Sequence, residues 1–178
     1  MSATVVLVES NGHPAADTII TSLPMGSVDA PNLDPDTNKI TAGQNSFEKW
    51  IRAKITALTS DLNIVDNFRI YLSDIGAGWK ADEGIKCNLS ISDKVYVAAS
   101  YPAGGPVASL SAVAIYDLPV DEPAQGNVGI GGDLSAQIIP TTTLPVYTDY
   151  AVLQLQTAVD TPTGAVNPKV LTVQWDEQ

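Results

Sequence analysis

Two successive stretches of alternating apolar and polar residues stand between Gln44 and Ser73. In the first stretch, the two parities separate a mainly apolar set from a mainly polar and aromatic set: Phe47, Ile51, Ala53, Ile55 and Ala57 against Glu48, Trp50, Arg52, Lys54 and Thr56. In the second stretch, the two sets are Phe68, Ile70 and Leu72 against Asn67, Arg69 and Tyr71. A period of two sends one set of side chains into a core and the other towards solvent or a partner. We therefore predict two successive β-strands on which the remaining strands pack.

A helix over Ser46 to Leu58 is the alternative interpretation of the first stretch. Several apolar residues also lie at helical spacing: Phe47, Trp50, Ile51, Ile55 and Leu58. Asn45 or Ser46 would then be the N-cap, with Glu48 in the first turn. We prefer the strand because the parity pattern is clear and because Thr-rich, β-prone sequence surrounds it.

Short apolar or alternating segments predict further strands along the chain. They cover residues 4–8, 18–23, 85–91, 94–99, 109–116, 127–130, 134–139, 148–159 and 169–175. The first is either buried on both faces or an edge segment held in a partner. We expect the last two to pair antiparallel across their long link. About ten short strands predict an all-β fold, an immunoglobulin-like or jelly-roll β-sandwich or a closely related barrel.

The length of 178 residues fits a single domain spanning 1–178. Residues 28–45 are rich in Pro, Asp, Asn and Gly, which predicts a long surface loop with a short extended piece around residues 39–41. Residues 1–45 could also include an extended N-terminal arm. Twelve Pro and thirteen Gly favour short strands and turns over long helices.

Nine basic and twenty acidic side chains give a formal charge of −11. This balance argues against binding nucleic acid or an anionic membrane surface, because both attract positive charge. It is compatible with docking onto a basic protein surface. No apolar run approaches the roughly 20 residues that span a bilayer. The N-terminus lacks the basic region of a signal peptide, so we expect synthesis in the cytoplasm.

No obvious catalytic constellation is present. His13 is the only histidine, so a nucleophilic triad would have to use it with Cys87 or a serine, and neither residue is flanked by a known signature. An exposed loop histidine and a half-buried structural cysteine are the commoner arrangement. The single cysteine also excludes an intrachain disulfide and a cysteine-cluster metal site. We expect no enzymatic activity, no cofactor and no metal.

Two acidic segments have a functional alternative. An oxygen-rich run, formed by Asp29, Asn32, Asp34, Asp36 and Asn38, could hold calcium. It departs from the EF-hand pattern, since Lys39 replaces the turn glycine and Asn45 the bidentate glutamate, and such residues also form turns for conformational reasons.

The second segment combines Asp74, Asp82 and Glu83 with Trp79, as a glycosidase or lectin would, although a loop with a tryptophan plug explains it equally. Gly129 to Gly132 lacks the remaining features of a nucleotide-binding loop, so it predicts a bulge or a tight turn.

Two groups of residues are candidates for protein contacts. Trp50, Arg52 and Tyr71 lie on the outward parity of the organising strands, and aromatic and arginine side chains anchor many interfaces. The alternative is that a second sheet covers that face. Val5, Val6 and Leu7 belong to the N-terminal apolar run, which could add to a neighbouring sheet as a strand.

Five blocks of this sequence resemble small structural proteins encoded among the virion genes of tailed bacteriophages. The blocks are SVDAPNL, ITAGQNSFEKWIRAKI, NFRIYLSD, EGIKCNLS and TDYAVLQLQTAVDTPTGAVNPKVLTVQWDEQ. They cover 70 of the 178 residues, contain no catalytic signature and leave residues 95–140 unmatched. The resemblance implies a capsid decoration (cement) protein on the virion surface, often trimeric, which binds the major capsid protein and stabilises the head.

Three other functions remain open. The same β-sandwich could serve as a tail, neck or fibre component. It could bind carbohydrate through Trp79 or tyrosine side chains. A hydrolase using Asp82, Glu83 or His13 is the third alternative.

Overall fold

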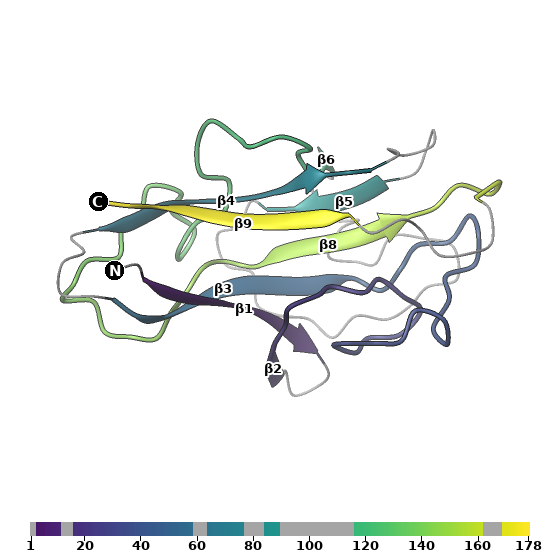
Figure 1. The fold of residues 1–178 in the computed structure, drawn as a ribbon, viewed down its shortest axis with the longest axis horizontal. Helices are drawn as coiled ribbons and strands as arrows, with labels where there is room; N and C mark the ends of the chain where they lie inside the picture. The colour runs from purple at the N-terminus through teal and green to yellow at the C-terminus, as the bar shows by residue number, and fades with distance from the viewer. Residues whose placement is uncertain (1–2, 12–15, 59–63, 77–83, 90–115, 162–168) are drawn as a thin grey trace.

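The computed structural model describes residues 3–11, 16–58, 64–76, 84–89, 116–161 and 169–178. This part of the chain contains nine strands and no helix, arranged in two antiparallel sheets (Figure 1). The strands are β1 (Thr4–Asn11), β2 (Ala16–Ile19), β3 (Lys49–Ala57), β4 (Val65–Asp74), β5 (Gly84–Asn88), β6 (Tyr116–Asp117), β7 (Val146–Tyr147), β8 (Ala151–Gln156) and β9 (Val170–Glu177). The predicted all-β class and sandwich architecture are confirmed.

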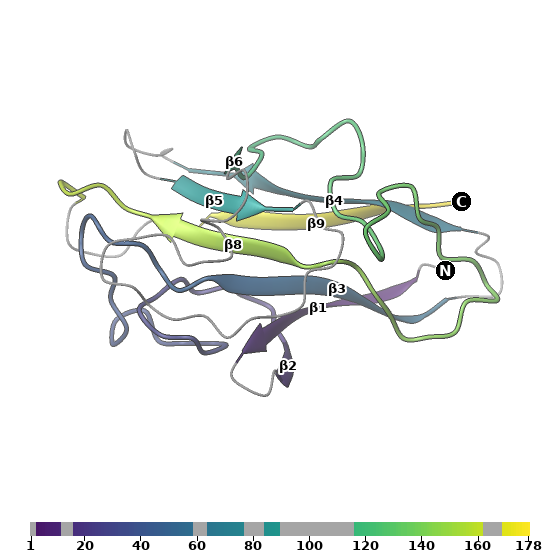
Figure 2. The same cartoon turned by 180° about the vertical axis from the view of Figure 1, so that it is seen from behind.

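The larger sheet has the order β2-β1-β3-β8-β5-β6, and β7 pairs with β3 beside β8. The smaller sheet consists of β4 and β9. Figures 1 and 2 show this second sheet running alongside the first, with both chain ends at the same end of the molecule. A hydrogen bond of 2.9 Å from the Ala3 amide to Glu177 Oε1 joins the two ends.

The apolar parity of the two organising strands builds the core between the sheets. Ile51, Ala53 and Ile55 of β3 are each at most 3% exposed, and the apolar side chains of β4 belong to the same cluster. Residues 49–57 form a strand, so the preference for strand over helix is confirmed. The period of two was the correct signal here because one face of β3 packs into the core and the other lies on the outside of the larger sheet.

The predicted pairing of the last two strands is wrong. β8 lies between β3 and β5 in the larger sheet, whereas β9 pairs with β4 in the smaller one. Both edges of β8 are already used by its neighbours, so no edge remains for β9. β8 and β9, although consecutive along the chain, therefore belong to different sheets. Alternation identifies a strand, but it does not specify the partner of that strand.

Residues 127–130 and 134–139 are not strands, contrary to the prediction. They make only isolated bridges, between Ile130 and Asp133 and between Ile138 and Val65. The first bridge closes a tight turn in which Gly131 and Gly132 have φ angles of 60° and 83°. Two successive positive φ angles suit glycine, so the predicted tight turn is confirmed.

The N-terminal segment lies inside the larger sheet. β1 pairs with β3 along most of its length and with β2 near its C-terminal end. It is therefore a strand of this chain, where an arm would extend away from the sheet. β2 ends at Ile19, earlier than the predicted 18–23. Residues 28–45 contain no strand, as expected for a loop. The predicted strand at 94–99 lies outside the described residues, as does all of the predicted strand at 109–116 except Tyr116, which begins β6.

Candidate protein-interaction site

The six predicted interface residues do not share one surface. Val6, Trp50 and Arg52 point to the outer face of the larger sheet, because Val6 pairs with Lys54 and Ser10 with Trp50. Val5 and Leu7 have the opposite parity and pack against the core. Tyr71 lies on the outer face of the smaller sheet. Only part of the predicted group can therefore act together.

Burial further reduces the number of predicted residues that a partner could reach. Trp50 is 2% exposed and Tyr71 is 7% exposed, so the chain itself covers both rings. The Trp50 Nε1 donates to Glu48 Oε2 at 3.0 Å, and the indole meets Tyr150 edge to face with ring centroids 5.4 Å apart. The side chain of Arg52, in contrast, keeps 24% of its surface exposed. Arg52 thus remains the accessible member of the predicted aromatic and arginine set.

Arg52 is the centre of a compact cluster on the larger sheet. Its guanidinium carbon lies 4.0 Å from the centroid of the Tyr147 ring and 4.6 Å from that of Tyr150. One guanidinium nitrogen contacts Asp17 Oδ2 at 2.8 Å. The Lys54 ammonium lies 5.4 Å from the Tyr147 centroid. We call the partly exposed members the Arg52 patch, namely Val6, Asp17, Arg52, Lys54 and Tyr147.

Four strands supply this patch, so its geometry depends on the sheet and not on a loop. Val6 comes from β1, Asp17 from β2, Arg52 and Lys54 from β3, and Tyr147 from β7. The cross-strand pairs Val6 with Lys54 and Lys54 with Tyr147 put these side chains on one face. Stacking on tyrosine and the ion pair with Asp17 hold the guanidinium in place, which reduces the entropy lost when a partner binds.

The other members of the patch have weaker signals in the amino-acid pattern. Tyr147 lies in a strand of only two residues, and the chain then leaves its pairing register with β3 before β8 begins. Asp17 lies in the short β2, where no alternation can be recognised. Lys54 shares the parity of Trp50 and Arg52, so parity alone could have added it.

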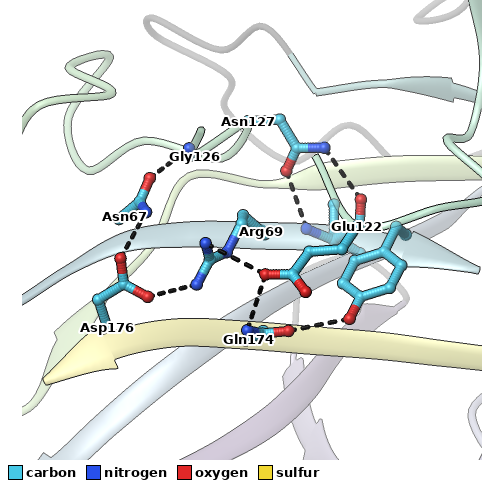
Figure 3. Close-up of polar contacts among 9 residues, drawn as sticks. Asn67, Arg69, Glu122, Gly126, Asn127, Gln174 and Asp176 are labelled. Atoms are coloured by element: carbon cyan, nitrogen blue, oxygen red, sulfur yellow. Dashed lines mark hydrogen bonds and ion pairs between the residues drawn. The ribbon is translucent and has the colours of Figure 1, made fainter. Parts of the chain in front are cut away.

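A second polar cluster covers the outer face of the smaller sheet (Figure 3). Arg69 forms ion pairs with Asp176 and, at 3.3 Å, with Glu122. Asn67 donates to Asp176 Oδ2 at 2.6 Å and accepts a hydrogen bond from the Gly126 amide. These contacts join β4, β9 and the segment that contains Glu122 and Gly126.

The same segment takes the place of a neighbouring strand along the edge of β4 that does not pair with β9. Asn127 Oδ1 accepts from the Ile70 amide at 2.8 Å, and Asn127 Nδ2 donates to the Ile70 carbonyl at 2.9 Å. The side-chain amide thus makes both bonds that a neighbouring peptide group would make. Nearby, the Leu72 amide donates to the Pro119 carbonyl at 2.8 Å. We conclude that this cluster holds the segment on the sheet.

The hydrogen bond from Asn67, with a further contribution from Arg69, holds the pKa of Asp176 below its usual value. Asp176 therefore stays ionised near neutral pH and acts as an acceptor. A carboxylate that already accepts from an amide and a guanidinium is suited to fixing structure and poorly suited to proton transfer.

In the acidic loop, Asp34 uses its side-chain oxygens within its own turn. Asp34 Oδ1 accepts from the Asp36 amide at 2.9 Å, and Asp34 Oδ2 accepts from the Thr37 hydroxyl at 2.7 Å. The bond from Thr37 is the main reason why the pKa of Asp34 is lowered. Asp29 accepts from Asn11 Nδ2 at 2.8 Å. Within the described ranges, no group of three or more His, Cys, Asp or Glu residues is arranged to hold a metal ion.

The other residues considered for chemistry fall into two groups. Cys87 is fully buried, where the sequence predicted a half-buried residue, because its side chain belongs to the core cluster. Asp74 accepts from the Gly76 amide at 2.7 Å in a turn. The remaining candidates, His13, Trp79, Asp82 and Glu83, lie outside the described residues.

A buried ion pair lies at one end of the core and has no counterpart in the predictions. Lys49 Nζ is 2.9 Å from Glu9 Oε1, and both side chains have 0% exposure. Lys49 also donates to the Ala30 carbonyl at 2.7 Å, and Asn11 donates to Glu9 at 2.7 Å. These bonds tie β1 and β3 to the loop that begins near residue 28. The only signal in the sequence is a lysine on the apolar parity of β3.

Comparison with protein-family models, with curated proteins and with solved structures gives no match. In the part of the chain that the structure describes, no helix is long and apolar enough to cross a membrane.

Proposed function

We propose that this chain is a non-enzymatic virion structural protein, a capsid decoration protein that binds the major capsid protein through the Arg52 patch. The observation that carries the contact is the arginine held between tyrosine and aspartate on a rigid, partly exposed sheet face. Arginine and tyrosine are enriched among the residues that dominate binding energy at interfaces. The assignment of the partner rests on the resemblance to small virion proteins.

The physical demands of a decoration role agree with this surface. A protein that reinforces a shell needs no reaction centre, only a firm contact that is repeated at many equivalent positions. Many copies convert a modest individual affinity into a large gain in shell stability. A β-sandwich presents its outer face with little freedom to rearrange, which keeps the entropic cost of each contact low. The resemblance further implies that the protein binds as a homotrimer.

The test is binding of the purified protein to expanded capsids that lack it, with bound copies counted by gel densitometry or cryo-electron microscopy. Arg52→Ala removes the centre of the patch, and Lys86→Ala is the matched control. Lys86 is also a partly exposed cation paired with a carboxylate, Asp117 at 2.6 Å, but it lies on β5 at the far side of the larger sheet. We expect stoichiometric decoration by the wild type and by Lys86→Ala.

For Arg52→Ala we expect affinity to fall by at least about tenfold, which corresponds to roughly 1.4 kcal/mol. Shells decorated with the wild type should also resist heating better than bare shells. Equal binding by both variants would remove the Arg52 patch from the contact. Absence of binding to the shell, or density confined to the tail, neck or a fibre, would overturn the decoration role and favour one of those structural roles.

A further inference from the structure

Strand β9 has an edge that nothing in the described structure covers. β9 pairs only with β4, and no further backbone bond is made by Leu171, Val173 or Trp175 towards the other side. The Ile70 amide donates to Asn127 and the Leu72 amide donates to Pro119, so both point away from β9. Their cross-strand partners, Val173 and Leu171, must therefore also direct their N–H and C=O groups away from β4.

The other sheet edges in the described residues are short or protected. β2 has four residues and β6 has two, whereas β9 has eight. The outer edge of β4 is covered by residues 118–128 and by Ile138. β9 contains neither proline nor glycine, and the register shifts in its pairing place the extra residues on β4. Apart from the two acidic residues at its C-terminal end, it therefore lacks the features that usually prevent edge strands from pairing with another chain.

The side chains on this edge are apolar and incompletely covered. Leu171, Val173 and Trp175 pack against the core cluster but stay only partly buried. Val170, at the start of the strand, is 49% exposed. An additional strand along β9 would extend the two-stranded sheet and cover part of this apolar surface, which favours association.

We propose that the occupant of this edge is β9 of a second copy, paired antiparallel about a two-fold axis at Val173. This register places Leu171 opposite Trp175 of the other copy and Thr172 opposite Gln174. It also places Lys169, which precedes the strand, opposite Glu177 at its end. Leu171 and Trp175 thus meet each other, Val173 meets its own copy, and Lys169 meets Glu177 twice in the dimer, whereas Val170 lies opposite Asp176.

Both members of each charge pair also contact their own chain. Lys169 Nζ donates to the Ile75 carbonyl. Glu177 Oε1 accepts from the Ala3 amide and from Trp175 Nε1, at 2.9 and 2.8 Å. A carboxylate has several acceptor positions, so a further cation can bind it. The self-complementary sequence is the reason to favour a second copy over an unrelated strand.

This contact is isologous, so it cannot be the contact that closes a three-fold ring. The inference does not rest on the proposed decoration role, because it concerns a different sheet and is tested on the isolated protein. It predicts a dimer with a continuous four-stranded sheet in the order β4-β9-β9-β4.

The test is site-specific disulfide formation combined with sedimentation. In the proposed register, Thr172 faces Gln174 of the other copy as a non-hydrogen-bonded pair, with Cα atoms about 4.5 Å apart and therefore within disulfide range. Thr172→Cys and Gln174→Cys are made as separate proteins. We expect an interchain disulfide when the two are mixed and oxidised, and little when either is oxidised alone. The native Cys87 is fully buried and serves as the internal control.

Charge reversal tests the same register without cysteine chemistry. Lys169→Glu and Glu177→Lys should each weaken dimerisation by roughly tenfold in sedimentation equilibrium, because two like-charge pairs replace two attractive ones. The double variant should recover the wild-type dissociation constant. Circular dichroism must show that each variant is folded. A wild-type protein that stays monomeric at high concentration, or that forms trimers without the mixed disulfide, would overturn the proposal.

Discussion

The residue that best illustrates the internal constraints of this chain is Lys49. Its ammonium is fully buried against Glu9. Removing two charges from water costs desolvation free energy, which is offset only when the charges form well-aligned hydrogen bonds. Lys49→Met should therefore destabilise the protein by about 3–5 kcal/mol, because it leaves a buried carboxylate without its cation. Urea unfolding followed by tryptophan fluorescence would measure the change.

The double variant Glu9→Gln with Lys49→Met provides the control for this mutation. A neutral amide can keep the hydrogen bond from Asn11 and carries no charge that needs a partner. The double variant should therefore be more stable than Lys49→Met alone. If it were equally unstable or less stable, the loss in Lys49→Met would come from the packing of the lysine stem and not from the isolated charge.

Asp176 should contribute to the pH dependence of folding. Its pKa is lowered in the folded state, mainly by Asn67 and then by Arg69, so its stabilising effect is fully present above the pKa of the unfolded chain. This effect is lost as the pH falls through the lowered pKa. As the pH falls below about 4, the wild type should thus lose stability more steeply than Asp176→Asn. Thermal unfolding across this range measures both slopes, and parallel slopes would contradict the assignment.

At the scale of elements, substitutions in β9 can distinguish an effect on folding from an effect on association. The Val173 amide faces the free edge, so Val173→Pro removes a donor for a second copy without removing a bond to β4. Thr172→Pro, one residue earlier, removes a bond to β4 instead. We expect Val173→Pro to be folded and monomeric, and Thr172→Pro to be strongly destabilised. Sedimentation and circular dichroism distinguish the two, and a dimeric Val173→Pro would place the contact elsewhere.

The elements themselves were more predictable than their partners. Alternation of apolar and polar residues identified β3 and β4 because each strand has one face in the core and another outside it. It could not identify the partners of β8 and β9, since pairing depends on which edges remain available in three dimensions. Alternation also wrongly predicted a strand at residues 134–139, because an extended segment beside β4 has the same apolar pattern as a strand.

The candidate site was predictable only in part, for a related reason. Arg52 was found because it lies on the outward parity of a long strand. Trp50 has the same parity, yet it is buried because Tyr150 and Val152 pack around it. The exposure of a side chain depends on which other residues pack over its face of the sheet. The alternation within one strand contains no information about those residues. Tyr147 was missed because its strand has only two residues.

At the scale of the whole molecule, the charge of −11 opposes any contact between two copies. This repulsion acts over the full size of the protein, whereas the two terminal ion pairs proposed for the β9 contact act at short range. Salt shortens the screening length from about 10 Å at 0.1 M to about 3 Å at 1 M, so it suppresses the long-range repulsion first.

Dimerisation through β9 should therefore strengthen as sodium chloride is raised from low concentration to about 0.5 M, because backbone hydrogen bonds and apolar contacts supply most of its stability. Sedimentation equilibrium at several salt concentrations would measure the trend. The double reversal of Lys169 and Glu177 is the control, since it preserves both the net charge and the local pairs. A contact that weakened steadily with salt would instead depend mainly on its ion pairs, and would not have the predominantly backbone and apolar character inferred for the β9 edge.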